Sequence, residues 1–404
     1  MTRRTGRRPP TRLTRLVALV VTVASLVPAS AQTPQPTHLT AAPALAAAYD
    51  AIYDARFDDV PALLTRACGG SGATRSARAT GPREACQLLE VVSTWWRIQL
   101  DPNDRSRDED FRERADASIA AIDAWTMREP MRAEPWFYLG GAYGARAQWR
   151  VLRGERLAAA RDGKRIKDAL ERSLALDPAL QDAYFGIGLY HYYADVAPAA
   201  AKFLRWLLLL PGGDRVEGLE EMLKARDQGE LLRSEADYQL HLVYLWYEKQ
   251  PQRALELLRD LRARHPRNPH FLERIADIED VYLHDTAASM RTWQTLLEAA
   301  QSGRIAEPVM AETTARLGLA RQLDRRHETD AAVTQLRTVI DSKPATPVGA
   351  LARAQLQLGQ ALDRLGQRSE AIAAYRAALE HVPSGDPDRV APAARAGLRA
   401  PRAR

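Results

Sequence analysis

The fold is decided by residues 358–383, LGQALDRLGQRSEAIAAYRAALEHVP. Apolar residues recur there three and four positions apart, which is the spacing of one face of a helix. Small residues occur where two such helices would cross closely, larger residues fill the space between them, and Pro383 ends the second helix. The stretch predicts an antiparallel helix pair. Its defining positions are Leu358, Gly359, Ala371, Tyr375, Ala378 and Pro383.

Parts of this pattern recur earlier in the chain. An alanine precedes a proline by the same twelve residues in two earlier places, and a first-helix glycine follows an aromatic residue by four positions. Such recurrence predicts further helix pairs of the same kind. The recurring positions are Trp136, Leu139, Gly140, Tyr143, Tyr184, Gly188, Ala254, Pro266, Ala332 and Pro344.

These positions resemble the tetratricopeptide repeat, whose pattern runs W-x2-L-G-x2-Y, then alanines and aromatics, then proline. The resemblance implies an all-α, right-handed superhelical solenoid of antiparallel helix hairpins with a concave groove lined by first helices. The intervals are irregular before the last two repeats, so the N-terminal and central parts are divergent. The central block is similar to exported bacterial repeat proteins of undefined function.

The start of the chain predicts export. Six arginines and no acidic residue occur in residues 1–31, which also hold the apolar run Leu16–Val27 and end in Ala29-Ser30-Ala31. This order is that of a cleaved secretory signal peptide, and a run of twelve residues is too short to span a bilayer. We therefore expect a periplasmic or secreted protein.

The net charge of +6 follows from that segment. Without its six arginines the chain has 51 basic and 51 acidic residues, so nothing in the charge favours nucleic acid as a partner. Residues 385–404 hold five arginines and two aspartates, which leaves a net charge of −3 on residues 32–384, and we expect this basic tail to be disordered.

The chain divides by composition and repeat pattern. Residues 1–31 are the signal peptide and 32–40 a linker, followed by N-terminal helical hairpins over 41–130. Divergent, aromatic-rich repeats are expected over 131–305, a regular repeat pair over 306–384 and the basic tail over 385–404. Cys68 and Cys86 flank a Gly/Ser/Ala/Thr-rich loop, and in an exported chain they predict a disulfide.

No set of residues with the spacing of a catalytic, phosphate-binding or metal-binding motif occurs, so we predict no catalytic residue, cofactor or metal. Two segments invite other readings. Pro211–Arg215 could hold an anion, although Asp214 followed by Glu217 is more typical of a helix cap. The apolar run Phe203–Leu210 suits a buried helix or a surface that contacts a membrane or a partner protein.

The function predicted is that of an exported scaffold, not an enzyme, which binds partner proteins or peptides. In the register of the family, Phe137, Phe185, Leu189 and Tyr192 would face the groove and anchor the partner, because aromatic residues contribute much of the energy at interfaces. Two alternatives remain open. One is a peripheral factor of cell-envelope assembly that contacts a membrane, and the other is an enzyme with an unrecognised site between helices.

Overall fold

A computed structural model describes residues 38–69, 80–196 and 212–401 of the chain. Every described residue belongs to the compact unit Thr37–Arg404, and the signal peptide, residues 32–37 of the linker and Phe203–Leu210 lie outside the described residues. Within the described part the regular structure is entirely helical, which confirms the predicted all-α class.

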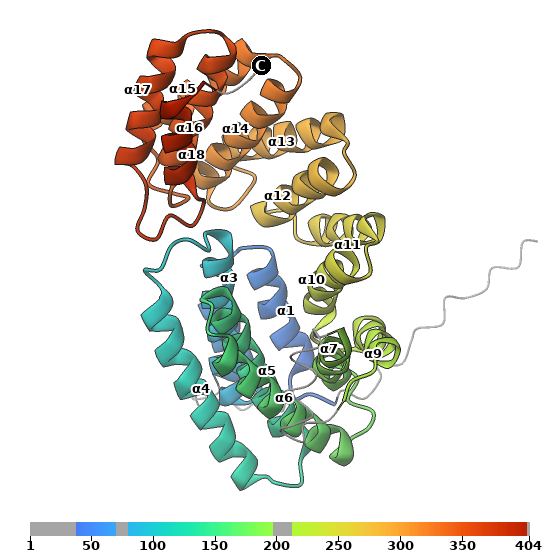
Figure 1. Ribbon diagram of the computed structural model, residues 1–404. Helices are drawn as coiled ribbons and strands as arrows, with labels where there is room; N and C mark the ends of the chain where they lie inside the picture. Colours follow the sequence, from blue (N-terminus) through green and yellow to red (C-terminus); the bar gives the residue numbers. More distant parts are fainter. Residues whose placement is uncertain (1–37, 70–79, 197–211, 402–404) are drawn as a thin grey trace, which may run out of the picture. The chain divides into compact units, whose positions relative to one another are not determined.

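The first half of this unit begins with three helices, two before the undescribed segment 70–79 and one after it. They are α1 (Ala42–Tyr53), α2 (Val60–Cys68) and α3 (Arg83–Leu100). The next four are α4 (Asp108–Arg128), α5 (Ala133–Leu152), α6 (Arg156–Leu176) and α7 (Ala183–Val196), and α9 (Arg215–Gln228) follows the second gap. Each helix packs mainly against its neighbours along the chain (Figure 1).

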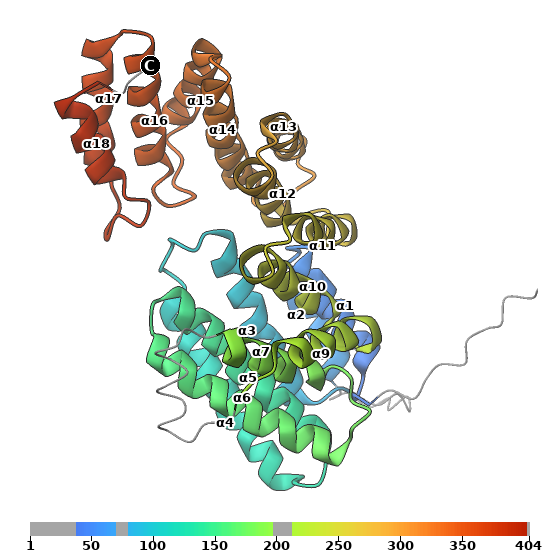
Figure 2. The ribbon, with the colours of Figure 1, turned by 45° about the vertical axis from the view of Figure 1, so that its right-hand side comes forward.

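The second half continues as hairpins. Its helices are α10 (Arg233–Leu242) with the π-helical turn η1 (Val243–Tyr247), α11 (Pro251–Arg264), α12 (Pro269–Asp277) with η2 (Ile278–Tyr282), and α13 (Thr286–Gln301). The last five are α14 (Pro308–Arg325), α15 (Thr329–Ser342), α16 (Ala350–Arg364), α17 (Arg368–Glu380) and α18 (Val390–Arg399) (Figure 2). Neighbouring helices run side by side as antiparallel pairs, which is a solenoid of helix hairpins.

Glycines lie where paired helices cross closely. A Cβ atom on Gly359 of α16 would lie 2.7 Å from the Tyr375 ring of α17. A Cβ on Gly140 of α5 would lie 2.7 Å from the Leu170 side chain of α6. Both distances are too short for a real side chain, so the absence of a Cβ allows the two backbones to approach.

The hairpins α10–α11 and α12–α13 are built alike, 35 residues apart. The amide of Glu248 donates to the carbonyl oxygen of Val243, and the amide of Leu283 donates to that of Ile278. Each bond spans five residues and closes one wide π turn at the end of the first helix of its hairpin. The next residue in each case, Lys249 or His284, has a left-handed backbone with φ of 53° and 55°. The two repeats therefore share a turn that no glycine marks in the sequence.

The first hairpin is tied to helices much later in the chain. The Tyr53 hydroxyl donates 2.6 Å to Glu235 of α10, and the Asn268 side-chain amide donates 2.8 Å to the Tyr53 carbonyl oxygen. The amide of Arg267 likewise donates 2.8 Å to Asp54. One apolar core consequently includes residues from Leu39 to Met310 and spans several helix pairs. Two further cores lie within residues 272–319 and 317–394.

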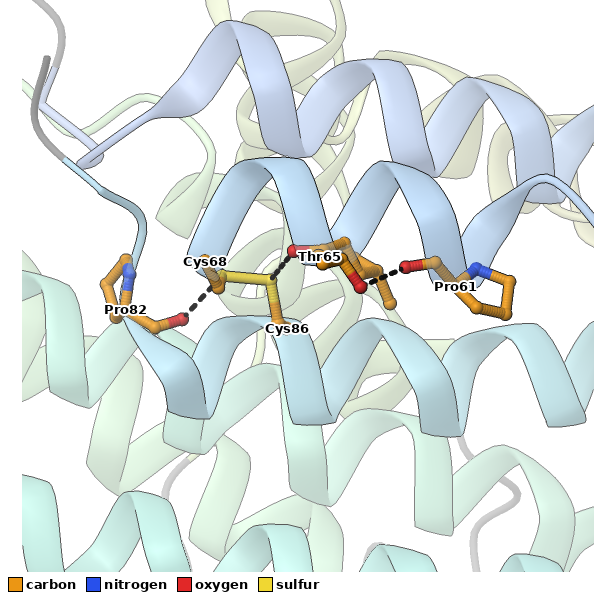
Figure 3. Close-up of a disulfide and its surroundings, with 6 residues drawn as sticks. Pro61, Thr65, Cys68, Pro82 and Cys86 are labelled. Carbon is orange, nitrogen blue, oxygen red and sulfur yellow. Dashed lines mark hydrogen bonds between the residues drawn. A yellow bond between two sulfur atoms is a disulfide. The ribbon is translucent and has the colours of Figure 1, made fainter. Parts of the chain in front are cut away.

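The disulfide prediction is confirmed. Cys68 at the end of α2 is bonded to Cys86 in the second turn of α3, and Figure 3 shows the bridge between the two helices. The Cys68 sulfur also lies 3.0 Å from the carbonyl oxygen of Pro82. The bond closes the loop that contains residues 70–79 and anchors α2 to the helix that follows it.

Two expectations about the chain ends are corrected. Residues 390–399 of the expected disordered tail form α18, whose buried Val390 and Ala394 pack on the core of α16 and α17. In the expected linker, Leu39 is buried and the Thr40 hydroxyl donates 2.9 Å to Glu134. Apolar contacts of Val390 and Ala394 hold α18 in place, and the buried Leu39 with the Thr40 hydrogen bond holds the residues just before α1.

Candidate functional site

An open cleft with a volume of about 350 Å³ lies among α11, α12, η2 and α13. We call it the arginine cleft, because three guanidinium groups line it. Its other lining residues are apolar or carry hydroxyls, with a single carboxylate. The lining residues are Arg259, Arg262, Leu272, Ile275, Glu279, Ala288, Arg291, Thr292 and Thr295.

Helical periodicity brings these side chains together. Arg259 and Arg262 are three residues apart on α11, which places them on one face of that helix, and Leu272 and Ile275 are spaced in the same way on α12. The α13 residues occupy positions i, i+3, i+4 and i+7 starting from Ala288. Leu258 and Leu261 are buried beside the two arginines, and this apolar face holds α11 in place.

The arginines outnumber their acidic partners. Arg259 donates 3.1 Å to Glu279, whose carboxylate also accepts 2.7 Å from the Thr292 hydroxyl. Within the described residues, neither Arg262 nor Arg291 has a carboxylate within 4.0 Å. The Nε atom of Arg262 is buried and has no hydrogen-bond partner in that part of the chain.

Burial lowers the pKa of Arg262, although the charge of Asp54 opposes the shift. A buried donor without an acceptor is unfavourable by about 1–3 kcal/mol. Guanidinium groups bind carboxylates through two parallel hydrogen bonds, while Leu272 and Ile275 offer apolar contact next to them. The arrangement therefore suits a ligand that carries a carboxylate beside an apolar group.

A second exposed feature lies at the ends of the two π turns. Trp246 is 50% exposed and its indole nitrogen donates 3.2 Å to the hydroxyl of Tyr282. Tyr247 and Val281 are exposed beside them in the two turns, and a depression of about 450 Å³ is lined by Leu245, Trp246, Lys249, Pro251 and Tyr282. We call the four exposed residues Trp246, Tyr247, Val281 and Tyr282 the aromatic edge. Exposed apolar clusters of this kind are typical of interaction surfaces.

The residues predicted to line the groove are buried. Phe137 and Phe185 belong to the core, and Tyr192 is fully buried with its hydroxyl donating to Glu248. Leu189 is half-buried against the same core. Phe137, Phe185 and Tyr192 therefore fill the space between helices, and the anchoring role of the four residues stays a prediction.

The structure supports the helix cap predicted for Pro211–Arg215. The Asp214 carboxylate accepts hydrogen bonds of 2.8 and 3.0 Å from the amides of Val216 and Glu217, which lie in the first turn of α9. Pro211 lies outside the described residues. Asp214 therefore satisfies two of the amides that an anion would need at this helix start.

One group of possible metal ligands emerges that sequence analysis did not predict. His191 of α7 and both Glu217 and Glu221 of α9 place their ligand atoms within 4.8 Å of one another. The sequence signal available was the spacing of Glu217 and Glu221, four residues apart on one helix, but the histidine comes from another helix. The arginine cleft was missed for a similar reason, because its three arginines come from two helices.

The comparison with known families identifies the repeat. Residues 353–384, which cover most of α16 and all of α17, match the model of the tetratricopeptide repeat. These residues form a tetratricopeptide repeat. The matched residues contain the close crossing of Gly359 and Tyr375, so the sequence pattern and the helix packing agree in this repeat. No helix in the described part of this repeat protein is both long and apolar enough to cross a membrane.

Several solved structures have some likeness to this chain. One is NprR in complex with its cognate peptide NprX, with 9% identity and a TM-score of 0.38. The match covers 88% of this chain and 81% of the NprR chain. A Rap protein complexed with competence and sporulation factor has 14% identity and a TM-score of 0.42, covering 89% and 96%. The apo form of RapI has 12% identity and a TM-score of 0.38, covering 89% and 81%. The comparison with curated proteins found no match.

Proposed function

We propose that this protein is an exported scaffold that binds an acidic segment of a partner protein in the arginine cleft. The observation that carries the proposal is the pair of arginines, Arg262 and Arg291, that lack carboxylate partners among the described residues. An aspartate or glutamate of the partner would pair with them, and a neighbouring apolar side chain would contact Leu272 and Ile275. Affinity would then come from charge and apolar contact together.

The aromatic edge supports the same proposal. Trp246 and Tyr282 lie on the π turns at the ends of the two first helices, and η2 contributes both Tyr282 to this edge and Glu279 to the arginine cleft. Tryptophan and tyrosine are enriched among the residues that dominate binding energy at interfaces. A protein partner is large enough to contact both features, whereas a small metabolite would fill only one.

Export is the other half of the proposal. It is supported by the basic and apolar pattern of residues 1–31 and by the Cys68–Cys86 disulfide, a bond that persists in oxidising compartments. Cell fractionation and N-terminal sequencing of the purified protein test it. We expect the protein in the periplasm or medium with Gln32 as its first residue, and an intact Met1 in the cytoplasm would contradict export.

Peptide binding is tested by fluorescence anisotropy with labelled peptides of equal length. One peptide alternates glutamate with leucine, and the other replaces each glutamate by glutamine. We expect tight binding of the acidic peptide alone, and a loss of affinity of about tenfold or more in Arg291→Glu because one favourable charge contact becomes repulsive. The matched control is Arg376→Glu, an exposed arginine of α17 outside the cleft.

Two outcomes would contradict the proposed site. Equal binding of both peptides would show that charge plays no part, and an equal loss in Arg291→Glu and Arg376→Glu would show only a general effect of net charge. If the site holds, affinity capture from cell-envelope extract with wild-type and Arg291→Glu protein would identify the partner as the protein that only the wild type retains.

A further inference from the structure

Helices α7 and α9 cross each other at close range, with a glycine of each helix at the crossing. A Cβ atom on Gly188 of α7 would lie 2.6 Å from the carbonyl oxygen of Gly218 on α9, and a Cβ on Gly218 would lie 2.6 Å from that of Gly188. The two backbones are therefore in direct contact. Side chains within one turn of this crossing are brought together by the packing of the backbone, not by their own attraction.

Three potential metal ligands lie within one turn of the crossing. His191 follows Gly188 by three residues, and Glu217 and Glu221 flank Gly218 on one face of α9. Their ligand atoms lie within 4.8 Å of one another, and the Nδ1 atom of His191 is 2.8 Å from the Oε2 atom of Glu221. The hydrogen bonds from the Val216 and Glu217 amides to Asp214 fix the backbone of the first turn of α9.

An ordinary ion pair between His191 and Glu221 explains only part of this arrangement. It does not account for the second carboxylate, Glu217, which is close enough to repel Glu221. Two adjacent carboxylates beside a half-buried imidazole are stabilised more fully by a divalent cation than by one histidine.

We propose that His191, Glu217 and Glu221 bind one zinc ion between α7 and α9. An imidazole with two carboxylates is a ligand set that zinc accepts in tetrahedral geometry, with water in the fourth position. Calcium and magnesium prefer six or more oxygen ligands, which this cluster does not supply. Both cysteines of the chain are in the Cys68–Cys86 disulfide, so no thiolate competes for the ion.

The inference does not depend on peptide binding, because the arginine cleft is built from other helices. The ion would join α7 to α9 across the segment 197–211 that connects them in the chain. A zinc ion held by ligands from both helices stabilises the folded pair, since the unfolded chain does not hold the three ligands together. Metal binding should therefore raise the melting temperature as well as give a binding isotherm.

The test uses the tag-free protein, freed of metal with a chelator and titrated with zinc chloride in a calorimeter. We expect one zinc ion per chain, no comparable binding of magnesium or calcium, and a rise in melting temperature with zinc. Cobalt(II) serves as a spectroscopic probe, because a tetrahedral site with a histidine ligand gives visible absorption bands that a purely structural ion pair would not produce.

His191→Gln and Glu217→Gln should each weaken zinc binding by at least about tenfold, and each should abolish the tetrahedral cobalt bands. The matched controls are Glu220→Gln, an exposed glutamate on the same helix, and His381→Gln, an exposed histidine after α17, and both should bind zinc as the wild type does. Far-UV circular dichroism without metal checks that all four variants fold.

Absence of zinc binding to the wild-type protein overturns the proposal. So does zinc binding that survives both His191→Gln and Glu217→Gln, or that is lost equally in the two controls, because the ion would then be bound elsewhere.

Discussion

Asn268 donates a 2.8 Å hydrogen bond from its side-chain amide to the main-chain carbonyl oxygen of Tyr53, 215 residues earlier in the chain. The other atom of the same amide, Oδ1, accepts 3.0 Å from the backbone of His270 and caps the start of α12. Asn268 is fully buried. One side chain thus begins a helix and fastens the end of α1 to it.

Replacing this residue should be costly. Asn268→Ala removes the cap of α12 and leaves the buried Tyr53 carbonyl without its donor, so we expect a loss of about 2–3 kcal/mol in the free energy of unfolding. Urea denaturation measures it. Asp285→Ala is the control, because Asp285 caps α13 from an exposed position and makes no such tether, and it should lose only about 1 kcal/mol. Equal losses in the two variants would mean that the link to Tyr53 contributes nothing.

The disulfide should contribute mainly by restricting the unfolded chain. Cys68 and Cys86 are separated by 18 residues, and closing a loop of that length is worth about 3 kcal/mol in the chain-entropy model. We expect the double variant Cys68→Ala/Cys86→Ala to lose about that amount in urea denaturation. A reducing agent should lower the stability of the wild type to the same level and leave the double variant unchanged. A wild type that is insensitive to reduction would contradict this account.

Two glycines offer a matched test of the close helix crossings. Gly359→Ala places a methyl group against the Tyr375 ring, and we expect a loss of about 1–3 kcal/mol from overpacking. Gly163→Ala, within α6, meets nothing within 4 Å and should gain up to about 1 kcal/mol from better helix propensity. Thermal melts of both variants measure the change in melting temperature. A change of the same sign in both would contradict the close contact between Gly359 and the Tyr375 ring.

Acid should destabilise the protein through its buried histidines. Burial is the main cause that lowers the pKa of His270 to about 3 and of His265 to about 4, from 6.5 in the unfolded chain. The unfolded state therefore binds more protons below pH 6.5, and stability falls as the pH drops towards 3. His270→Gln should lose less stability between pH 7 and pH 5 than the wild type, as measured by urea denaturation at both pH values. Equal losses of stability in the variant and the wild type would contradict the lowered pKa of His270.

Glu273 should act in the opposite direction. Burial, with the charge of Asp277, raises the pKa of the Glu273 carboxyl to about 7 from an ordinary 4.5. The folded state then binds more protons between pH 4.5 and 7, so this residue adds stability as the pH falls through that range. Glu273→Gln should consequently show a steeper acid loss than the wild type in the same denaturation series. A shallower loss would show that the carboxyl is ionised in the folded protein.

Sequence analysis predicted the local features well. The α16–α17 pair, the Asp214 cap and the Cys68–Cys86 bond depend on residues close together in the chain, and their spacing identifies them. Helix periodicity places Phe185 on the apolar face of its helix. It does not show, however, whether that face lines a groove or packs against a neighbouring helix. That difference depends on the tertiary packing of the next helices.

The features that sequence analysis missed share one property. The arginine cleft, the group around His191 and the Tyr53–Asn268 link each join residues from helices that are not a single hairpin. Their charged and polar members carry no motif, because each helix supplies only one or two of the charged side chains. A pattern that is divided among helices becomes visible only when their order in space is known.

The π turns also explain a detail of length. Lys249 and His284 occupy the same place in successive hairpins but are 35 residues apart, one more than the standard repeat. A π turn accommodates one extra residue without changing the direction of the helix that contains it. An insertion at η2 is thereby absorbed locally, whereas the same insertion in the middle of α11 would rotate every later side chain of that helix by about 100°. The array can therefore gain or lose a residue at these two turns while the helices beyond them keep their faces.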